Sequence, residues 1–162
     1  MDIETIGPDF SDWDALLALI HGAFAYMDGV VDPPASGLRL TVDELSAKAR
    51  TETGLIAVEG GRIVGCAFLA EKDDHVYLGK LAVCGDYQRR GIGQALVRHA
   101  EALARRAGKP ALVLQTRIEL TGNHRAFGRM GFVRTAETAH PGYDRPTSVT
   151  MRKTLEAGVE VR

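Results

Sequence analysis

A basic stretch that contains two glycines is the part of the sequence most suited to chemistry. Residues 88–94 read Gln-Arg-Arg-Gly-Ile-Gly-Gln. Gly91 and Gly93 lack a Cβ atom, so the backbone can curl tightly and present several N–H groups to one anion. A helix that begins here adds unpaired N–H groups and the positive end of its dipole. Arg89 and Arg90 add full charges, so the stretch predicts a binding site for a pyrophosphate.

Two widespread phosphate-binding motifs do not fit this stretch. A Walker loop needs a Gly-Lys-Ser/Thr triplet at a fixed spacing, and none follows these glycines. A dinucleotide-binding fingerprint needs a third glycine at the position of Leu96. From the residue types alone, a glycine-softened turn before a surface helix is the alternative to an anion site.

A strand before the stretch and a helix after it are expected to position it. The strand covers residues 75–83, and a second, fully apolar strand covers residues 111–116. Apolar residues at helical spacing predict a helix of about 16 residues between them: Ile92, Leu96, Ala100, Leu103 and Ala107. Glu101 and Arg105 are expected on its solvent-facing side as a favourable ion pair.

The remaining segments complete a mixed α/β fold. Further strands are expected over residues 1–6, 55–59, 62–70, 132–137 and 148–154, with Gly60-Gly61 as a hairpin turn. Ser11 is expected as the N-cap of a first helix, a Thr41–Glu44 capping box opens a second, and another helix covers residues 123–130. The order β-α-α-β-β-β-α-β-α-β-β predicts one domain over residues 1–162, an α+β fold with a mostly antiparallel sheet flanked by helices.

Composition excludes several classes of function. The chain has 20 Lys+Arg and 21 Asp+Glu, a net charge of −1, which makes a broad nucleic-acid binder unfavourable. No apolar run reaches the roughly 18 residues of a membrane span, and the acidic start lacks the basic residues of a signal peptide. We therefore expect a cytoplasmic protein without a membrane partner. The five histidines show no metal spacing and the two cysteines no disulfide framework, so no metal is expected.

The charges are distributed unevenly along the chain. Residues 1–87 hold fifteen acidic and six basic side chains, whereas residues 88–162 hold six acidic and fourteen basic ones. The sign changes at the start of the glycine-containing stretch. We expect the basic half to hold an anionic ligand and the acidic half to border a cationic one.

At this point the sequence resembles a known family, the GCN5-related N-acetyltransferases. Residues 88–93 match its pyrophosphate signature, residues 81–83 match the strand before that signature, and Asn123, Phe127 and the Gly131-Phe132 pair match its second motif. The resemblance is good over residues 55–135. It implies acetyl-coenzyme A (acetyl-CoA) as co-substrate, held by twelve residues: Leu81, Ala82, Val83, Gln88, Arg89, Arg90, Gly91, Ile92, Gly93, Gln94, Asn123 and Phe127.

The resemblance also implies how the cofactor lies. The strands at residues 81–83 and 111–116 would splay apart, and the pantetheine arm would pair with the backbone of Leu81 and Val83. The Val83 N–H would stabilise the oxyanion that develops on the thioester carbonyl.

Two catalytic positions depart from the family pattern. Tyr77 stands where the family often has a glutamate base, which leaves a water relay to upstream polar residues as the alternative: Asp73, Asp74 and His75. Phe127 stands where many members have a tyrosine acid, which leaves Tyr143 and Tyr87 as candidates for that role.

The function implied is transfer of an acetyl group to a primary amine by direct attack in a ternary complex. The acceptor is a small molecule or a protein amine, bordered by the first two helices, the Pro33-Pro34 loop and residues 140–148. A non-catalytic acyl-CoA sensor is the alternative, motivated by Tyr77 and Phe127. Apolar edges leave a homodimer open.

Overall fold

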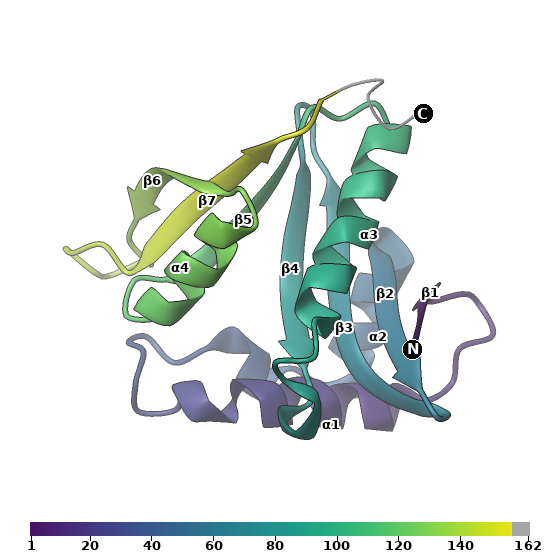
Figure 1. Cartoon of the computed structure of the whole chain (residues 1–162). Coiled ribbons are helices and arrows are strands. Elements are labelled where there is room, and N and C mark those ends of the chain that lie inside the picture. Colours follow the sequence, from purple (N-terminus) through teal and green to yellow (C-terminus); the bar gives the residue numbers. More distant parts are fainter. Residues whose placement is uncertain (157–162) are drawn as a thin grey trace.

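A seven-stranded sheet in the order β1-β2-β3-β4-β5-β7-β6 organises the chain (Figure 1). The computed structural model describes residues 1–156. Every pair of neighbouring strands is antiparallel except β4 and β5, which run parallel. The strands are β1 Asp2–Thr5, β2 Thr53–Glu59, β3 Arg62–Glu71, β4 Val76–Val83, β5 Ala111–Arg117, β6 Val133–Thr138 and β7 Ser148–Thr154. The expected mixed, mostly antiparallel α/β fold and its element order are confirmed.

Helices cover both faces of this sheet. α1 (Trp13–Phe24) and α2 (Val42–Thr51) lie on one face, and α3 (Ile92–Arg106) and α4 (Thr121–Arg129) on the other (Figure 1). β2 and β3 are buried on both faces because their alternate side chains enter two different hydrophobic cores. For example, Leu55 packs with the core under α3, while its neighbour Ile56 packs with the core under α1 and α2.

Two local predictions hold and one is wrong. The Thr41 Oγ1 accepts from the Glu44 N–H at 3.2 Å and the Thr41 N–H donates to Glu44 Oε1 at 3.0 Å, which is the expected capping box. Gly60 and Gly61 turn the β2–β3 hairpin with φ of +59° and +78°. Ser11 is not the N-cap of α1, because the helix begins at Trp13 after Asp12, whose side chain makes no capping hydrogen bond.

The buried stripe of α3 differs from the expected one. Glu101 is only 7% exposed, although we expected it to face solvent, and Ala107 is exposed. Glu101 lies four residues after Val97 and three before Ala104, both buried, so helical geometry carries it onto the packed face. Its carboxylate pairs with Lys153 Nζ of β7 at 2.9 Å and with Arg105 at 3.8 Å. The ion pair therefore links α3 to the far half of the sheet.

The sheet opens between β4 and β5. The two strands pair only at Val76–Leu112 and Tyr77–Val113 and then diverge, as the resemblance implied (Figure 1). On its other side β4 carries a bulge, because Cys66 pairs with Ala82 and Phe68 with Gly79, so one β3 residue faces two of β4. Within this bulge Lys80 adopts a left-handed backbone with φ of +50°.

Candidate active site

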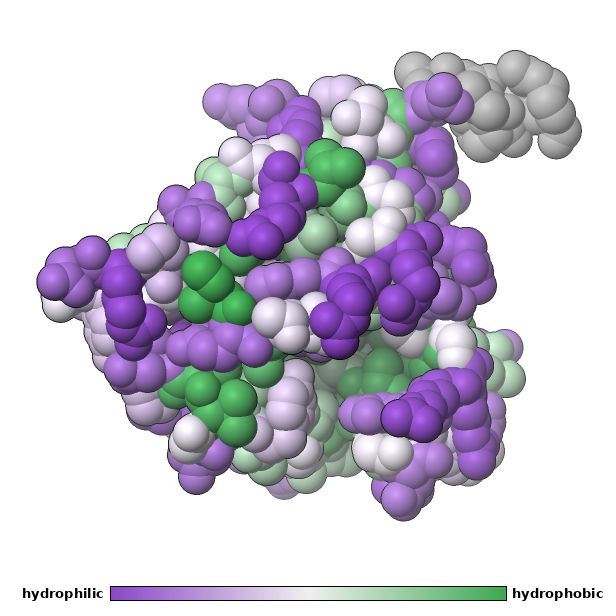
Figure 2. Space-filling view, turned by 60° about the vertical axis from the view of Figure 1, so that its left-hand side comes forward, coloured by the Kyte–Doolittle hydropathy of each residue, from purple (hydrophilic) through white to green (hydrophobic). Residues whose placement is uncertain are grey.

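Two cavities follow the gap between β4 and β5. The larger has a volume of about 830 Å³ and reaches the N-terminus of α3, and the smaller has a volume of about 400 Å³ and lies against residues 33–37 and the middle of β5. Figure 2 shows a recess in this side of the molecule, with hydrophobic residues in its floor and hydrophilic residues along its rims. Both cavities are lined by Phe24, Met27, Leu81, Asn123 and Phe127, so they meet as two ends of one cleft.

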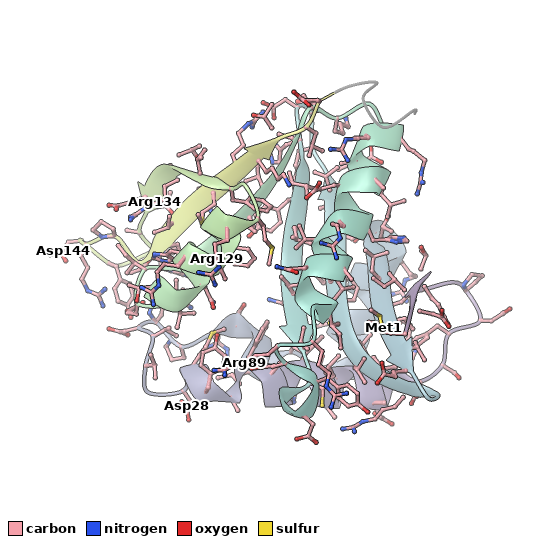
Figure 3. All side chains as sticks on the ribbon, viewed as in Figure 1. Met1, Asp28, Arg89, Arg129, Arg134 and Asp144 are labelled. Atoms are coloured by element: carbon pink, nitrogen blue, oxygen red, sulfur yellow. The ribbon has the colours of Figure 1, made fainter. Side chains whose placement is uncertain are left out.

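The residues expected to hold a cofactor gather at the larger cavity. All twelve line it except Arg90. The Arg90 guanidinium instead lies 4.8 Å from the Tyr87 ring and 3.8 Å from a Glu59 carboxylate oxygen. Of the two arginines expected to add charge, Arg89 alone lines this cavity, and Figure 3 shows it beside the start of α3.

The turn into α3 has the shape of an anion cradle. Gly91 is the N-cap of α3 with φ of +80°, a conformation that favours glycine, and a Cβ placed there would meet no atom within 4 Å. Gly91 and the first residues of α3 line the larger cavity, where the N–H groups of the first helical turn have no partner within the helix. Arg89 also has a positive φ, +67°. This arrangement fits a pyrophosphate.

The exposed edge of β4 fits the other end of such a cofactor. The Cys84 N–H donates to Val64 O of β3 at 2.8 Å, so the strand's alternation turns the Val83 N–H away from β3, toward the gap. Beyond Tyr77 no β5 residue pairs with this edge. An extended, amide-containing chain could add here as a further strand.

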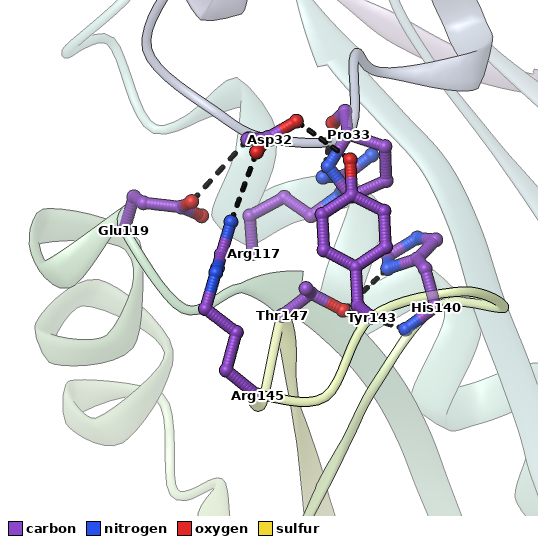
Figure 4. A network of polar contacts seen from close by, with 8 residues as sticks. All are labelled: Asp32, Pro33, Arg117, Glu119, His140, Tyr143, Arg145 and Thr147. Atoms are coloured by element: carbon purple, nitrogen blue, oxygen red, sulfur yellow. Dashed lines mark hydrogen bonds and ion pairs between the residues drawn. The ribbon is translucent and has the colours of Figure 1, made fainter.

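His140 lies in the wall of the smaller cavity and is held by Thr147 (Figure 4). Thr147 Oγ1 accepts from the His140 backbone N–H at 2.9 Å, contacts its Nδ1, and donates to Thr138 O at 3.4 Å. The contact with Thr147 engages Nδ1, so within residues 1–156 Nε2 is the ring nitrogen without a hydrogen-bond partner. Burial and the nearby Arg117 charge lower the pKa of His140, so the ring is neutral at neutral pH.

A polar contact network closes this side of the cleft (Figure 4). The Tyr143 hydroxyl donates to Asp32 Oδ1 at 2.7 Å, and Arg145 donates to Asp32 Oδ2 at 3.0 Å. Arg117 donates to the carbonyl oxygens of Pro33 and Pro34. The loop after α1 is thereby joined to β5 and to the loop between β6 and β7, which are more than 80 residues away in sequence.

Comparison with known proteins identifies the family. A profile described as "Acetyltransferase (GNAT) family" matches residues 13–132. The chain belongs to the GNAT acetyltransferase family.

Solved structures of GNAT proteins share the fold. The ribosomal-protein-S18-alanine N-acetyltransferase of Escherichia coli is 19% identical, with a TM-score of 0.73 over 99% of both chains. The PaiA N-acetyltransferase of Thermoplasma acidophilum in complex with coenzyme A is 18% identical, with a TM-score of 0.77 over 95% of this chain and 99% of that one. An aminoglycoside 6′-N-acetyltransferase complexed with coenzyme A is 16% identical, with a TM-score of 0.74 over 95% and 97%. A search of curated proteins found no match.

The candidate catalytic residues of this GNAT chain lie in different surroundings. Tyr77 lines the smaller cavity, and burial raises the pKa of its phenol, so it is a hydrogen-bond donor at neutral pH and not a base. Tyr143 lines neither cavity, and its hydrogen bond to Asp32 raises its pKa. Phe127 packs edge-on against Phe132, with ring centroids 5.9 Å apart.

The upstream polar residues lie away from the cleft. His75 Nδ1 pairs with Asp74 at 2.7 Å, and neither these two nor Asp73 lines either cavity. They sit at the end of β4 where β4 and β5 still pair, so the water relay considered from the sequence has no support here. No spacing rule in the sequence points to His140, because residues distant in the chain build its surroundings.

Two searches of residues 1–156 complete the description. No helix there is long and apolar enough to cross a membrane. In the same residues no three His, Cys, Asp or Glu side chains gather in a way that could hold a metal ion.

Proposed function

We propose that this chain is an acetyl-CoA-dependent N-acetyltransferase that acts on a primary amine by direct attack in a ternary complex. One observation carries the proposal: the cavity lined by the signature loop and the cavity lined by His140 meet at Leu81 and Phe127. A donor and an acceptor that enter from opposite ends would therefore reach each other at β4. The N-acetyltransferases among the structural neighbours are consistent with an amine acceptor.

The donor side is built from backbone groups. Acetyl-CoA would supply an activated acyl group as a thioester. The N-terminus of α3, the Gly91 turn and Arg89 would hold its pyrophosphate, and the edge of β4 would align its pantetheine arm. The Val83 N–H would then donate to the carbonyl oxygen as negative charge develops there. One such donor typically contributes about 10²–10³ in rate.

The acceptor side supplies a base. An amine must lose a proton as it becomes an amide, and the neutral His140 ring, with its Nδ1 held by Thr147, can accept that proton at Nε2. Attack by nitrogen forms the C–N bond and breaks the C–S bond, and the proton passes from His140 to the departing sulfur or to water. A thiol has an ordinary pKa of about 8.5 and is a fair leaving group, so Phe127 in place of a tyrosine acid does not prevent the reaction.

Tyr77 and Tyr143 take different roles in this proposal. The protonated Tyr77 phenol in the cavity wall orients the acceptor or its attacking nitrogen by donating a hydrogen bond. Tyr143 acts through Asp32, because their hydrogen bond holds the two loops that border the cavity. It is a positioning residue.

The test is thiol release from acetyl-CoA over a broad panel of primary amines, together with calorimetry of coenzyme A binding. Acetyl transfer predicts amine-dependent release that falls about 100-fold or more in His140→Gln. His75→Gln is the matched control, since it removes a histidine that lines neither cavity.

Two results would contradict the proposal in different ways. Coenzyme A binding without release on any amine would favour the acyl-CoA sensor, which Tyr77 and Phe127 at the usual catalytic positions motivate. Absence of coenzyme A binding at sub-millimolar concentration would refute the assignment of the larger cavity.

A further inference from the structure

The charged side chains that line the smaller cavity are of one sign. Arg39, Lys48, Lys80 and Arg117 line it together with His140, and among residues 1–156 no Asp or Glu does. This differs from the expectation that the acidic N-terminal half would border a cationic acceptor. That half contributes three of the four permanent cations and none of its acids, because the acids lie elsewhere on the surface or in ion pairs.

Two of these cations lack a carboxylate partner. Lys48 pairs with Glu52 at 2.9 Å, but within the described part of the chain Lys80 and Arg117 form no ion pair. Lys80 Nζ donates to the Ser36 hydroxyl at 3.2 Å, and Arg117 donates to backbone carbonyls. Neutral acceptors satisfy hydrogen bonds without cancelling charge, and the carboxylates that act on these two cations are not in contact with them: Glu52 acts on Lys80, and Glu119 and Asp32 act on Arg117. Half-buried cations in this state favour an anion beside them.

The backbone conformation of Lys80 also supports an anion-binding role for this residue. A left-handed conformation is unfavourable for a residue other than glycine, and Lys80 adopts it within the β4 bulge. Bulges near active sites often redirect a side chain. Here the bulge accompanies a lysine whose side chain lines the acceptor cavity. Burial and the Lys48 charge lower the pKa of Lys80, the Glu52 charge partly opposes them, and an anion bound beside Lys80 would oppose them further.

We infer that the acceptor is a small primary amine that also carries an anionic oxygen group, such as a carboxylate or a phosphate, bound by Lys80 and Arg117. The inference rests on the proposed function and narrows its substrate class. A cavity of about 400 Å³ suits a small molecule. Two guanidinium nitrogens of Arg117 already donate to the Pro33 and Pro34 carbonyls, so Arg117 offers the group its remaining N–H donors and its charge, and Lys80 adds a point charge.

The same cations affect the reacting amine. A neighbouring positive charge disfavours the ammonium form and lowers its pKa, so a larger share of the bound amine is neutral and able to attack. Amines with several positive charges and no anionic group would be repelled. The cavity thus selects against polycations while it favours acceptors that carry their own negative charge.

Matched pairs of acceptors test this inference. Each pair shares its amine and differs in the anionic group: alanine against ethylamine, lysine against cadaverine, and phosphoethanolamine against ethanolamine. We expect kcat/KM for the anionic member to exceed that of its partner by about tenfold or more, in keeping with charged hydrogen bonds. The pairs also separate carboxylate from phosphate recognition.

Variants of Lys80 tie the preference to the cavity. Lys80→Met should lower kcat/KM for the anionic member about 10- to 100-fold more than it lowers that of its partner, which loses only the effect of the charge on the amine. Lys80→Gly removes the same charge and relieves the strain of the left-handed backbone. It should therefore lower kcat/KM for the anionic member as Lys80→Met does, without loss of thermal stability. Lys72→Met, at an exposed turn lysine, is the control.

The outcomes separate the two proposals. Equal or better turnover of the members that lack an anionic group, or no effect of either Lys80 variant, would overturn the inference while acetyl transfer stands. Absence of turnover with every amine would refute the proposed function. In that case calorimetry on the coenzyme A-loaded protein decides the inference about the acceptor. Binding of alanine or phosphoethanolamine, without binding of ethylamine or ethanolamine, would support the inference. The absence of such a preference would refute it.

Discussion

Replacing Gly91 by alanine, beside a matched replacement elsewhere in the chain, distinguishes a loss of stability caused by backbone strain from a loss of coenzyme A binding. A methyl group at Gly91 would meet no protein atom within 4 Å, so it creates no clash inside the protein. It would instead project into the open space where the α3 turn is proposed to hold a pyrophosphate. Gly108, at the other end of α3, provides the matched control, since its φ of +75° is similar and a Cβ there also meets nothing.

The magnitudes follow from the conformation. A left-handed alanine costs roughly 1–2 kcal/mol, and at about 2–4 °C per kcal/mol for a chain of this size each variant alone should lower Tm by about 2–8 °C. Coenzyme A at a hundred times its Kd should stabilise the wild-type protein by about 2.7 kcal/mol, or about 5–11 °C. In Gly91→Ala, loss of one or two charged hydrogen bonds should weaken coenzyme A binding about tenfold or more. The same concentration of coenzyme A should then stabilise this variant by at most about 1.4 kcal/mol, or about 3–6 °C.

The assay is thermal unfolding of the wild-type protein, Gly91→Ala and Gly108→Ala with and without coenzyme A, with Kd measured by calorimetry. Both variants should be destabilised alike without ligand. Only Gly91→Ala should lose ligand stabilisation, because the 15 residues of α3 span about 22 Å and keep Gly108 far from the turn. Wild-type affinity in Gly91→Ala, or an equal loss of affinity in both variants, would refute the placement of the pyrophosphate.

Three further predictions address the acceptor side and the core. The pKa of His140 is lowered, so the fall of kcat/KM with decreasing pH that protonation of the acceptor amine causes should steepen below about pH 6.5, where the ring also gains a proton. His140→Gln should keep the amine-dependent slope and lack this extra limb in rates measured from pH 5 to 9. Burial raises the pKa of Cys66 to about 12, so a chromogenic disulfide reagent at pH 8 should react with Cys84 alone in the native protein and with both thiols in denaturant. Fast reaction of two thiols in the native protein would contradict the burial of Cys66. Asp32→Ala removes the contacts of Tyr143 and Arg145, so limited proteolysis should cleave residues 140–147 faster and the KM for the acceptor should rise. The Tm should change by no more than about 2–4 °C, because the side chains in these contacts are exposed.

The donor side of the cleft was predictable because its parts are contiguous. Residues 81–94 form a strand end, a turn and a helix start, and local chemistry determines each of them: the period of the apolar residues, a glycine at φ +80° and the unpaired N–H groups of α3. Local sequence does not report side-chain direction as well. Arg90 has the same charge as Arg89, yet it packs on Tyr87, because a turn sends successive side chains to different sides.

The acceptor side depends on contacts that no window of the sequence contains. Lys80 needs a register shift between β3 and β4 to lie in the cavity, Arg117 reaches the Pro33 and Pro34 carbonyls from β5, and Asp32 meets Tyr143 at a separation of 111 residues. The charge count shows the consequence. The first 87 residues are strongly acidic as a stretch of chain, yet the side chains that they place in the cavity are Arg39, Lys48 and Lys80. The sign of a binding surface is set by the few side chains that folding places in it. The excess of acids along the chain therefore predicted a cationic acceptor, whereas the cations that line the folded cavity favour an acceptor with an anionic group.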